Sequence, residues 1–174
     1  RRQSRRGVDP AAEIVDPRSI LHEMRVTKSA GELDIMRRAA DISREAHHEA
    51  CRQVAPGRYE YEIEAMLDYV FRRRGGSGPA YGSIVAGGRN AAILHYVTND
   101  QPLREGELLL VDAGAELEGY ASDVTRTYPI GGRFEGAGKA VYEVVLAAQE
   151  AALAAIRPGR TLPEIHEVTV RRLV

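Results

Sequence analysis

The sequence predicts an α+β fold in which helices come in pairs and a small sheet follows the first pair. Helical apolar spacing governs residues 29–74, short strand-like runs fill 83–128, and helical spacing returns from residue 139. Residues 54–63 align without gaps on residues 156–165 with five identities, so a helix, Pro-Gly, helix unit occurs twice, 102 residues apart. The length of 174 residues suits one globular domain.

Composition and charge narrow the functional classes. The chain carries 24 basic and 25 acidic side chains, whereas general nucleic-acid binding normally needs a basic surplus. Its longest apolar runs, such as residues 108–111, are far shorter than the roughly 20 residues that cross a bilayer. We therefore predict no nucleic-acid partner and no membrane partner. The lone Cys51 can form no internal disulfide, so the cytoplasm is the expected location.

The N-terminal part is predicted to hold a linker and two helices. Residues 1–26 are arginine-rich and lack an apolar period, which predicts an arm or interdomain linker. The first helix should begin at Ser29, whose spacing to Glu32 is that of a capping box. It should end at Pro-Gly, residues 56–57. A second helix is expected over residues 59–74, before a glycine-rich break.

Strand-like runs separated by turn residues occupy the middle of the chain. They are residues 83–86, 92–97, 107–114 and 119–128. A helix is then predicted over residues 139–156, and a capping box from Thr161 to Glu164 begins another. Because the second copy of the repeated unit reaches no sheet by Val174, we expect a chain cut half a repeat short.

A predicted hairpin in the strand region carries two acidic side chains. With a turn at residues 117–118, Asp112 lies directly opposite Asp123. With a turn at residues 118–119, Asp112 faces Thr125 and Asp123 becomes its diagonal neighbour. Because side chains alternate with a period of two along a strand, both registers place the two carboxylates on one face.

Two carboxylates on one half-buried face repel each other, and burial adds to the cost. Three arrangements would relieve the repulsion. They are a shared proton with a raised pKa, a neighbouring cation such as Arg126, and one or two hard metal ions bound through oxygen. The spacing alone leaves all three open.

The histidines carry a weaker signal than the aspartates. His95 lies in an apolar strand-like run just before a turn, where a lone histidine is more often a hydrogen-bonded core residue than a functional one. His47 and His48 lie on the first helix among charged neighbours, so we expect both to be solvated.

Three stretches of sequence resemble one protein family. They are residues 93–96, 111–116 and 119–129, which read ILHY, VDAGAE and GYASDVTRTYP. They resemble the aminopeptidase P (Xaa-Pro aminopeptidase) branch of the pita-bread metallopeptidases. Over residues 18–174, the resemblance implies an α+β pita-bread (creatinase/aminopeptidase) fold, present as its first half plus the opening helices of the second, pseudo-symmetric half. It implies a partial catalytic domain over residues 27–174, after the linker of residues 1–26.

The resemblance also implies a site, residue by residue. Asp112 matches a terminal ligand of one metal ion, Asp123 matches the carboxylate that bridges two, and His95 matches a catalytic histidine that holds the substrate and the tetrahedral intermediate. In the family, a hydroxide between two divalent ions, usually Mn²⁺, attacks the peptide bond before proline. The implied partner is a peptide with proline in its second position.

The match to the family's site is incomplete. The family's remaining ligands, one histidine and two glutamates, and a further catalytic histidine come from the second half of the fold and cannot be placed in this chain. We therefore expect the intact protein to be an Xaa-Pro aminopeptidase and this chain alone to be inactive.

Two alternatives remain open, and a homo-oligomer is a further expectation. A prolidase-like Xaa-Pro dipeptidase would share the hairpin and differ in how it holds the free carboxylate of its substrate. A non-catalytic pita-bread module would bind peptides or proteins, although it has no use for a poorly solvated pair of aspartates. Methionine aminopeptidase fits less well, because residues 1–26 look like a lead-in from a preceding domain.

Overall fold

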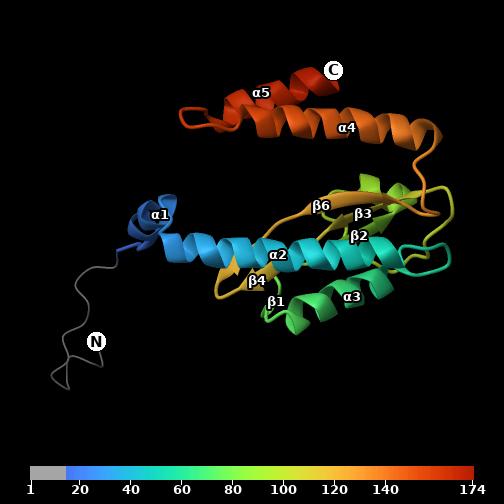
Figure 1. Ribbon diagram of the computed structural model, residues 1–174, viewed down its shortest axis with the longest axis horizontal. Coiled ribbons are helices and arrows are strands. Elements are labelled where there is room, and N and C mark those ends of the chain that lie inside the picture. The colour runs from blue at the N-terminus through green and yellow to red at the C-terminus, as the bar shows by residue number, and fades with distance from the viewer. Residues whose placement is uncertain (1–14) are drawn as a thin grey trace, which may run out of the picture. The chain divides into compact units, whose positions relative to one another are not determined.

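The computed structural model describes residues 15–174 (Figure 1). In chain order the elements are α1 (Arg18–Val26), α2 (Ala30–Gln53), α3 (Glu60–Arg73), β1 (Gly78–Pro79), β2 (Ile84–Gly87), a 3-10 helix (Gly88–Ala92), β3 (Leu108–Asp112), β4 (Ala115–Leu117), β5 (Tyr120–Ala121), β6 (Thr125–Pro129), α4 (Gly136–Ala155) and α5 (Leu162–Leu173). The chain divides into two compact units, Arg1–Asp34 and Ile35–Val174. Across the part of the chain that the structure describes, every helix is too short or too polar to cross a bilayer.

Helix α1 adds a regular element to the segment predicted to be an arm or interdomain linker. Residues 1–14 of the predicted linker lie outside the described residues, and α1 forms where no regular element was expected. The Asp16 carboxylate accepts hydrogen bonds from the backbone and guanidinium of Arg18 at the start of this helix. Its nine residues are all exposed, and so short a helix gives too few turns for an apolar period to stand out.

Helices α2 and α3 confirm the two predicted helices. The capping box of α2 is formed: Ser29 N–H donates to Glu32 Oε2 at 2.7 Å, and Glu32 N–H donates to Ser29 Oγ at 3.3 Å. Helix α3 begins after Tyr59, whose N–H donates to Glu62 Oε2 at 2.7 Å. These bonds satisfy backbone donors that the first turn of a helix leaves without partners.

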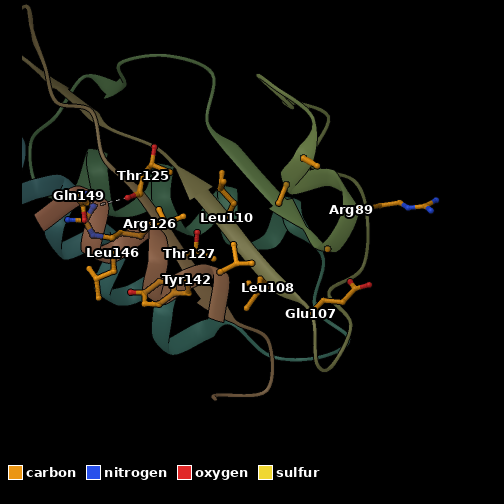
Figure 2. Close-up of a pocket in the computed structure, with 15 residues that line it drawn as sticks. Arg89, Glu107, Leu108, Leu110, Thr125, Arg126, Thr127, Tyr142, Leu146 and Gln149 are labelled. Atoms are coloured by element: carbon orange, nitrogen blue, oxygen red, sulfur yellow. Dashed lines mark hydrogen bonds between the residues drawn. The ribbon is translucent and has the colours of Figure 1, made fainter. Parts of the chain in front are cut away.

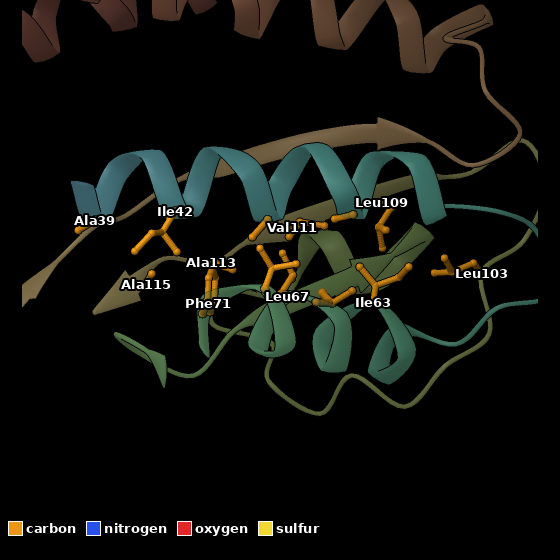
Figure 3. Close-up of a cluster of buried hydrophobic side chains, with 14 of the residues drawn as sticks. Ala39, Ile42, Ile63, Leu67, Phe71, Leu103, Leu109, Val111, Ala113 and Ala115 are labelled. Carbon is orange, nitrogen blue, oxygen red and sulfur yellow. The ribbon is translucent and has the colours of Figure 1, made fainter. Parts of the chain in front are cut away.

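The core lies between α2, α3 and one face of the strands (Figure 3). On β3, Leu109 and Val111 are fully buried in this core, while Leu108, Leu110 and Asp112 alternate with them and are only half-buried. The period of two therefore anchors β3 through its apolar residues and turns Asp112 to the opposite face.

The strands form two three-stranded antiparallel sheets, β1-β4-β5 and β2-β3-β6. Leu117 pairs with Tyr120 in one sheet and Asp112 pairs with Thr125 in the other. The hairpin therefore turns at residues 118–119, the second of the two predicted registers. Glu118 and Gly119 have φ of 52° and 82°, the left-handed pair that suits the twist of a two-residue hairpin loop.

The strand predicted at residues 92–97 is wrong. The structure has the 3-10 helix Gly88–Ala92 there, followed by a loop. Asn99 explains the difference, because its side chain occupies the free edge of β2. Its Oδ1 accepts from Val85 N–H, and its Nδ2 donates to Ser83 O, both at 2.9 Å. One buried amide thus satisfies backbone groups that a neighbouring strand would otherwise pair.

Helices α4 and α5 confirm the predicted second helix pair and pack against each other. The capping box of α5 is formed, with Thr161 N–H donating to Glu164 Oε2 at 2.8 Å. Several apolar side chains of α4 are exposed: Val141, Val144, Val145, Leu146 and Leu153. On α2, by contrast, the apolar stripe is buried against the strands.

Candidate metal centre

Two carboxylates meet at the point where the two small sheets join. Asp112 ends β3 and is half-buried, and Asp123 lies just before β6 and is exposed. The hydroxyl of Tyr81 lies 2.5 Å from Asp112 Oδ1 and 3.0 Å from Asp123 Oδ1. A single hydroxyl thus lies within hydrogen-bond distance of both aspartates, so the two carboxylates converge as the hairpin predicted.

Tyr81 remains a proton donor in this position. Burial, and then the hydrogen bonds and charges of Asp112 and Asp123, raise the pKa of the Tyr81 hydroxyl far above its ordinary value of 10. The phenol is therefore neutral at any physiological pH. Its single proton can bond only one carboxylate at a time, and a neutral phenol adds no positive charge to offset the two aspartates.

No guanidinium neutralises this charge within residues 15–174. Arg126, the cation that the sequence offered, donates instead to Thr125 O at 2.7 Å. The ion pairs of these residues are formed by other carboxylates than Asp112 and Asp123. Of the three arrangements that would relieve the repulsion, a shared proton and a metal ion remain.

The donor set fits a hard divalent cation but is incomplete. Carboxylate oxygens are the ligands that Mn²⁺ and Mg²⁺ prefer, and Asp112 at the end of β3 and Asp123 just before β6 could provide them. Within residues 15–174 no group of three or more histidine, cysteine, aspartate or glutamate side chains is placed to hold a metal ion. The described residues therefore offer two candidate ligands, which are too few to complete a metal site.

Tyr81 is a functional candidate that the sequence analysis missed. It lies in an irregular segment, 31 residues before Asp112 and 42 before Asp123. No local pattern links positions so far apart. Its hydroxyl nevertheless lies within hydrogen-bond distance of both aspartates and so connects them.

His95 does not occupy the strand predicted for it. It lies on the loop after the 3-10 helix, is exposed, and has a φ of 55°. Within residues 15–174, no hydrogen bond or ion pair joins His95 to Asp112 or Asp123. The expectation of a core histidine is therefore wrong, and the role that the family resemblance implies for His95 stays a prediction.

A buried carboxylate, Glu60, holds the loop that carries His95. Glu60 is 0% exposed, and Oε1 accepts from Gly87 N–H at 2.7 Å and Asn90 Nδ2 at 3.0 Å. Oε2 accepts from the Tyr96 hydroxyl at 2.8 Å and Gln101 N–H at 3.0 Å. Burial, and then the bond to Glu60, raise the pKa of Tyr96 to about 12. The loop is thus fixed at both ends and near its middle.

Replacing Glu60 with alanine should destabilise the protein strongly, because the donors around Glu60 lose their acceptor. Leaving these donors unpaired should lower the free energy of unfolding by about 3 kcal/mol or more. Urea unfolding measures this change, and Glu64→Ala, on the same helix, is the control, with an expected effect within about 0.5 kcal/mol. Equal losses for the two variants would show that the network contributes little.

His47 is buried, which corrects the prediction that it is solvated, whereas His48 is exposed as predicted. His47 Nε2 lies 3.0 Å from Ala113 O, and Nδ1 lies 3.0 Å from the Tyr128 hydroxyl. A carbonyl can only accept, so Nε2 carries the proton and Nδ1 of the neutral ring accepts from Tyr128. Burial, foremost, lowers the pKa of His47 below its ordinary value of 6.5.

The lowered pKa of His47 predicts a loss of stability in mild acid. Below about pH 6.5 the unfolded chain takes up the proton first, so the free energy of unfolding falls with pH until the folded imidazole is also protonated. At higher pH the ring is neutral in both states and adds no pH dependence. Urea unfolding at about pH 7 and about pH 5.5 should show a larger loss for the wild type than for His47→Gln. Equal losses would contradict the burial of a neutral imidazole.

A cavity of about 740 Å³ separates α4 from strands β3 and β6 (Figure 2). Figure 2 shows Leu108 and Leu110 on the strand side and Tyr142, Leu146 and Gln149 on the helix side. Asp112 and Asp123 are not among its lining residues. The cavity is apolar along most of its wall, Glu107 is the one acidic residue among those that line it, and it is distinct from the carboxylate pair.

Comparison with known proteins matches these features to one family. The profile of Metallopeptidase family M24 matches residues 34–174. The Xaa-Pro aminopeptidase of Escherichia coli (strain K12) is 40% identical over 174 residues, covering 100% of this chain and 40% of that protein. The Xaa-Pro dipeptidase of Homo sapiens is 38% identical over 162 residues, covering 88% of this chain and 33% of that protein.

Solved structures give the same result for the fold. The aminopeptidase PepP of Pseudomonas aeruginosa superposes with a TM-score of 0.90 at 50% identity, covering 99% of this chain and 39% of that structure. The chain thus spans about two fifths of the length of the curated relatives and structures that it matches most fully. The predicted pita-bread half and the resemblance to the aminopeptidase P branch are confirmed.

Proposed function

The chain belongs to metallopeptidase family M24. We propose that it is part of a metal-dependent aminopeptidase, which releases the N-terminal residue from peptides with proline in the second position. The observation that carries the proposal is the convergence of Asp112 and Asp123 on the Tyr81 hydroxyl. Two adjacent carboxylates that have no guanidinium partner among residues 15–174 favour divalent cations over a structural salt bridge.

Asp112 and Asp123 would hold the metal ions, and we propose that the site binds two divalent ions, Mn²⁺, through these carboxylates and further ligands. When bound, the ions supply the attacking oxygen nucleophile and neutralise the charge that develops on the peptide carbonyl. Tyr81 keeps its proton and donates to a carboxylate oxygen, so it orients an aspartate without competing as a ligand.

His95 would act on the substrate side of the site. Its exposed position on a loop leaves the imidazole free to donate a hydrogen bond to a peptide carbonyl. The Glu60 network anchors that loop, so His95 is presented from a fixed backbone rather than from a mobile one.

The proposal includes inactivity of residues 1–174 on their own. Two aspartates leave most positions around a divalent ion to water, and such sites bind weakly. The test compares the protein produced from its whole gene, here called the gene-encoded protein, with the 174-residue chain. Each is purified metal-free and assayed on Xaa-Pro peptides with added Mn²⁺. We expect hydrolysis only from a protein that supplies the remaining histidine and glutamate ligands. Hydrolysis by the 174-residue chain would contradict this part of the proposal.

A second candidate is a prolidase-like dipeptidase. The 38% identity to the human Xaa-Pro dipeptidase makes it a candidate. The hairpin alone does not distinguish the two activities. Comparing Gly-Pro with longer Xaa-Pro peptides separates them: an aminopeptidase prefers the longer substrates, and a dipeptidase prefers Gly-Pro. A gene-encoded protein that binds no Mn²⁺ and cleaves neither substrate would instead indicate a peptide-binding module. We propose a cytoplasmic location for either enzyme.

A further inference from the structure

One face of α2 holds the hairpin that carries both aspartates. Two polar side chains on this face, Ser43 and His47, are one helical turn apart and only 0% and 3% exposed. The other buried residues of α2 are apolar, namely the small Ala39, Ala46 and Ala50 and the larger Ile42. Figure 3 shows Ala39 and Ile42 of α2 on the side of the helix that faces Ala113 and Ala115 of the hairpin. Burying a polar side chain is costly unless it forms hydrogen bonds, so the partners of Ser43 and His47 show why they occupy this face.

Ser43 lies in a short chain of buried hydrogen bonds. Ala115 N–H donates to Ser43 Oγ at 2.8 Å, and Ser43 Oγ lies 2.6 Å from Ser122 Oγ. Ser122 Oγ in turn lies 3.2 Å from Ala39 O and 3.0 Å from Ala115 O. Because these carbonyl oxygens only accept, Ser122 donates to one of them and Ser43 donates to Ser122. The chain joins both arms of the hairpin to the helix.

His47 holds the same hairpin at Ala113, the residue that follows Asp112. Its Nε2 donates to Ala113 O at 3.0 Å, and the Tyr128 hydroxyl lies 3.0 Å from Nδ1 and 3.2 Å from the carbonyl oxygen of His47. Tyr128 belongs to β6. His47 therefore links α2 to β6 and to the residue that follows β3.

The bonded residues are direct neighbours of the aspartates in sequence. Ala113 follows Asp112, and Ser122 precedes Asp123. Each aspartate thus has one backbone neighbour fixed to α2 by a buried hydrogen bond. We propose that Ser43 and His47 are positioning residues, which set the separation of the two carboxylates and so the affinity of the site for metal ions. This inference rests on the proposed metal-dependent function.

The experiment measures Mn²⁺ binding to the gene-encoded protein by isothermal titration calorimetry, well below the melting temperature of each variant. The variants are Ser43→Ala and His47→Leu, which remove the polar groups, and His47→Gln, whose amide can still donate to Ala113 O. Ile63→Val is the matched control, because Ile63 is buried in the same core on α3 and makes no hydrogen bond to the hairpin.

Loss of an outer hydrogen bond to a metal site typically weakens metal binding by about 10- to 100-fold. We expect the Mn²⁺ dissociation constant to rise by this factor in Ser43→Ala and His47→Leu and to stay unchanged in Ile63→Val. In His47→Gln it should return toward the wild-type value. Hydrogen–deuterium exchange of residues 112–123 should speed up in the first two variants, even without metal, and not in the control.

The outcomes separate the two proposals. If the wild type binds Mn²⁺ and the dissociation constants of Ser43→Ala and His47→Leu equal the wild-type value, the positioning role is overturned. It is also overturned if His47→Gln binds Mn²⁺ as weakly as His47→Leu. In both cases the proposed function stands. A wild-type protein that neither binds Mn²⁺ nor hydrolyses Xaa-Pro peptides overturns the proposed function, and the positioning role with it.

Discussion

Replacing Asp123 with asparagine should abolish metal-dependent hydrolysis by the gene-encoded protein. The variant loses an anionic ligand, and metal ions contribute several kcal/mol to stabilising the charge of the transition state. That loss corresponds to a fall of roughly 10³-fold or more in kcat/KM. Steady-state hydrolysis of an Xaa-Pro peptide, with metal content measured on the same sample, tests the expectation.

The metal-free form of Asp123→Asn should change in the opposite direction. Removing one of two facing charges relieves their repulsion, which should raise the free energy of unfolding by up to about 1 kcal/mol. Glu118→Gln is the control, because it removes one negative charge from the turn of the same hairpin, where Glu118 forms an exposed ion pair with Arg38. An Asp123→Asn variant that keeps both its activity and its Mn²⁺-induced rise in melting temperature would rule out Asp123 as a ligand.

Replacing Gly114 with alanine should have the largest effect on stability. A Cβ at this position would lie 1.8 Å from Ser122 O and 2.5 Å from the Ser122 carbonyl carbon. Both are backbone atoms of the opposite arm of the hairpin, so the contact can be relieved only by opening the hairpin. We expect a loss of more than about 4 kcal/mol in the free energy of unfolding, or failure to fold.

Gly82→Ala is the matched control for this substitution. Its Cβ would meet only Val97 Cγ1 at 3.5 Å, an ordinary van der Waals contact. Urea unfolding compares the two variants, and any folded Gly114→Ala protein should bind Mn²⁺ more weakly because its carboxylates are spread apart. Gly114→Ala as stable as Gly82→Ala would mean that the hairpin tolerates a wider separation than the structure shows.

Most of the fold could be predicted from local sequence signals. The capping boxes at Ser29 and Thr161 and the Pro-Gly stops bound the helices α2, α4 and α5 because these signals act within a few residues. The hairpin was narrowed to two registers. The choice between them depended on the φ values of Glu118 and Gly119, and only the second position carries the glycine that favours a left-handed turn.

The candidate site was predicted only in part, because its supports come from distant residues. Asp112 and Asp123 stood out through their spacing on one hairpin, whereas Tyr81 reaches them across 31 and 42 residues. His47 was misjudged from its charged neighbours in sequence. A signal was present, since Ser43 and His47 fall on the helical stripe of Ala39, Ala46 and Ala50, and periodicity would have placed both in the interior.

The loop of His95 shows why an apolar run can mislead. Residues 92–97 have strand-like composition, but a strand needs a free edge, and the side chain of Asn99 takes the edge of β2. The loop is held instead by the carboxylate of Glu60, whose importance depends on four donors that fold brings to it. Neither interaction has a local sequence signature.

The 102-residue repeat relates α2 to α4, but the two helices carry different side chains at the positions that contact a neighbouring element. Shifted by that interval, Ser43 corresponds to Val145 and His47 to Gln149, and both of these line the cavity beside α4. The serine–serine chain therefore has no counterpart there, and an amide replaces the imidazole. At these two positions α4 offers an aliphatic side chain and an amide, whereas α2 offers a hydroxyl and an imidazole that hydrogen-bond the hairpin.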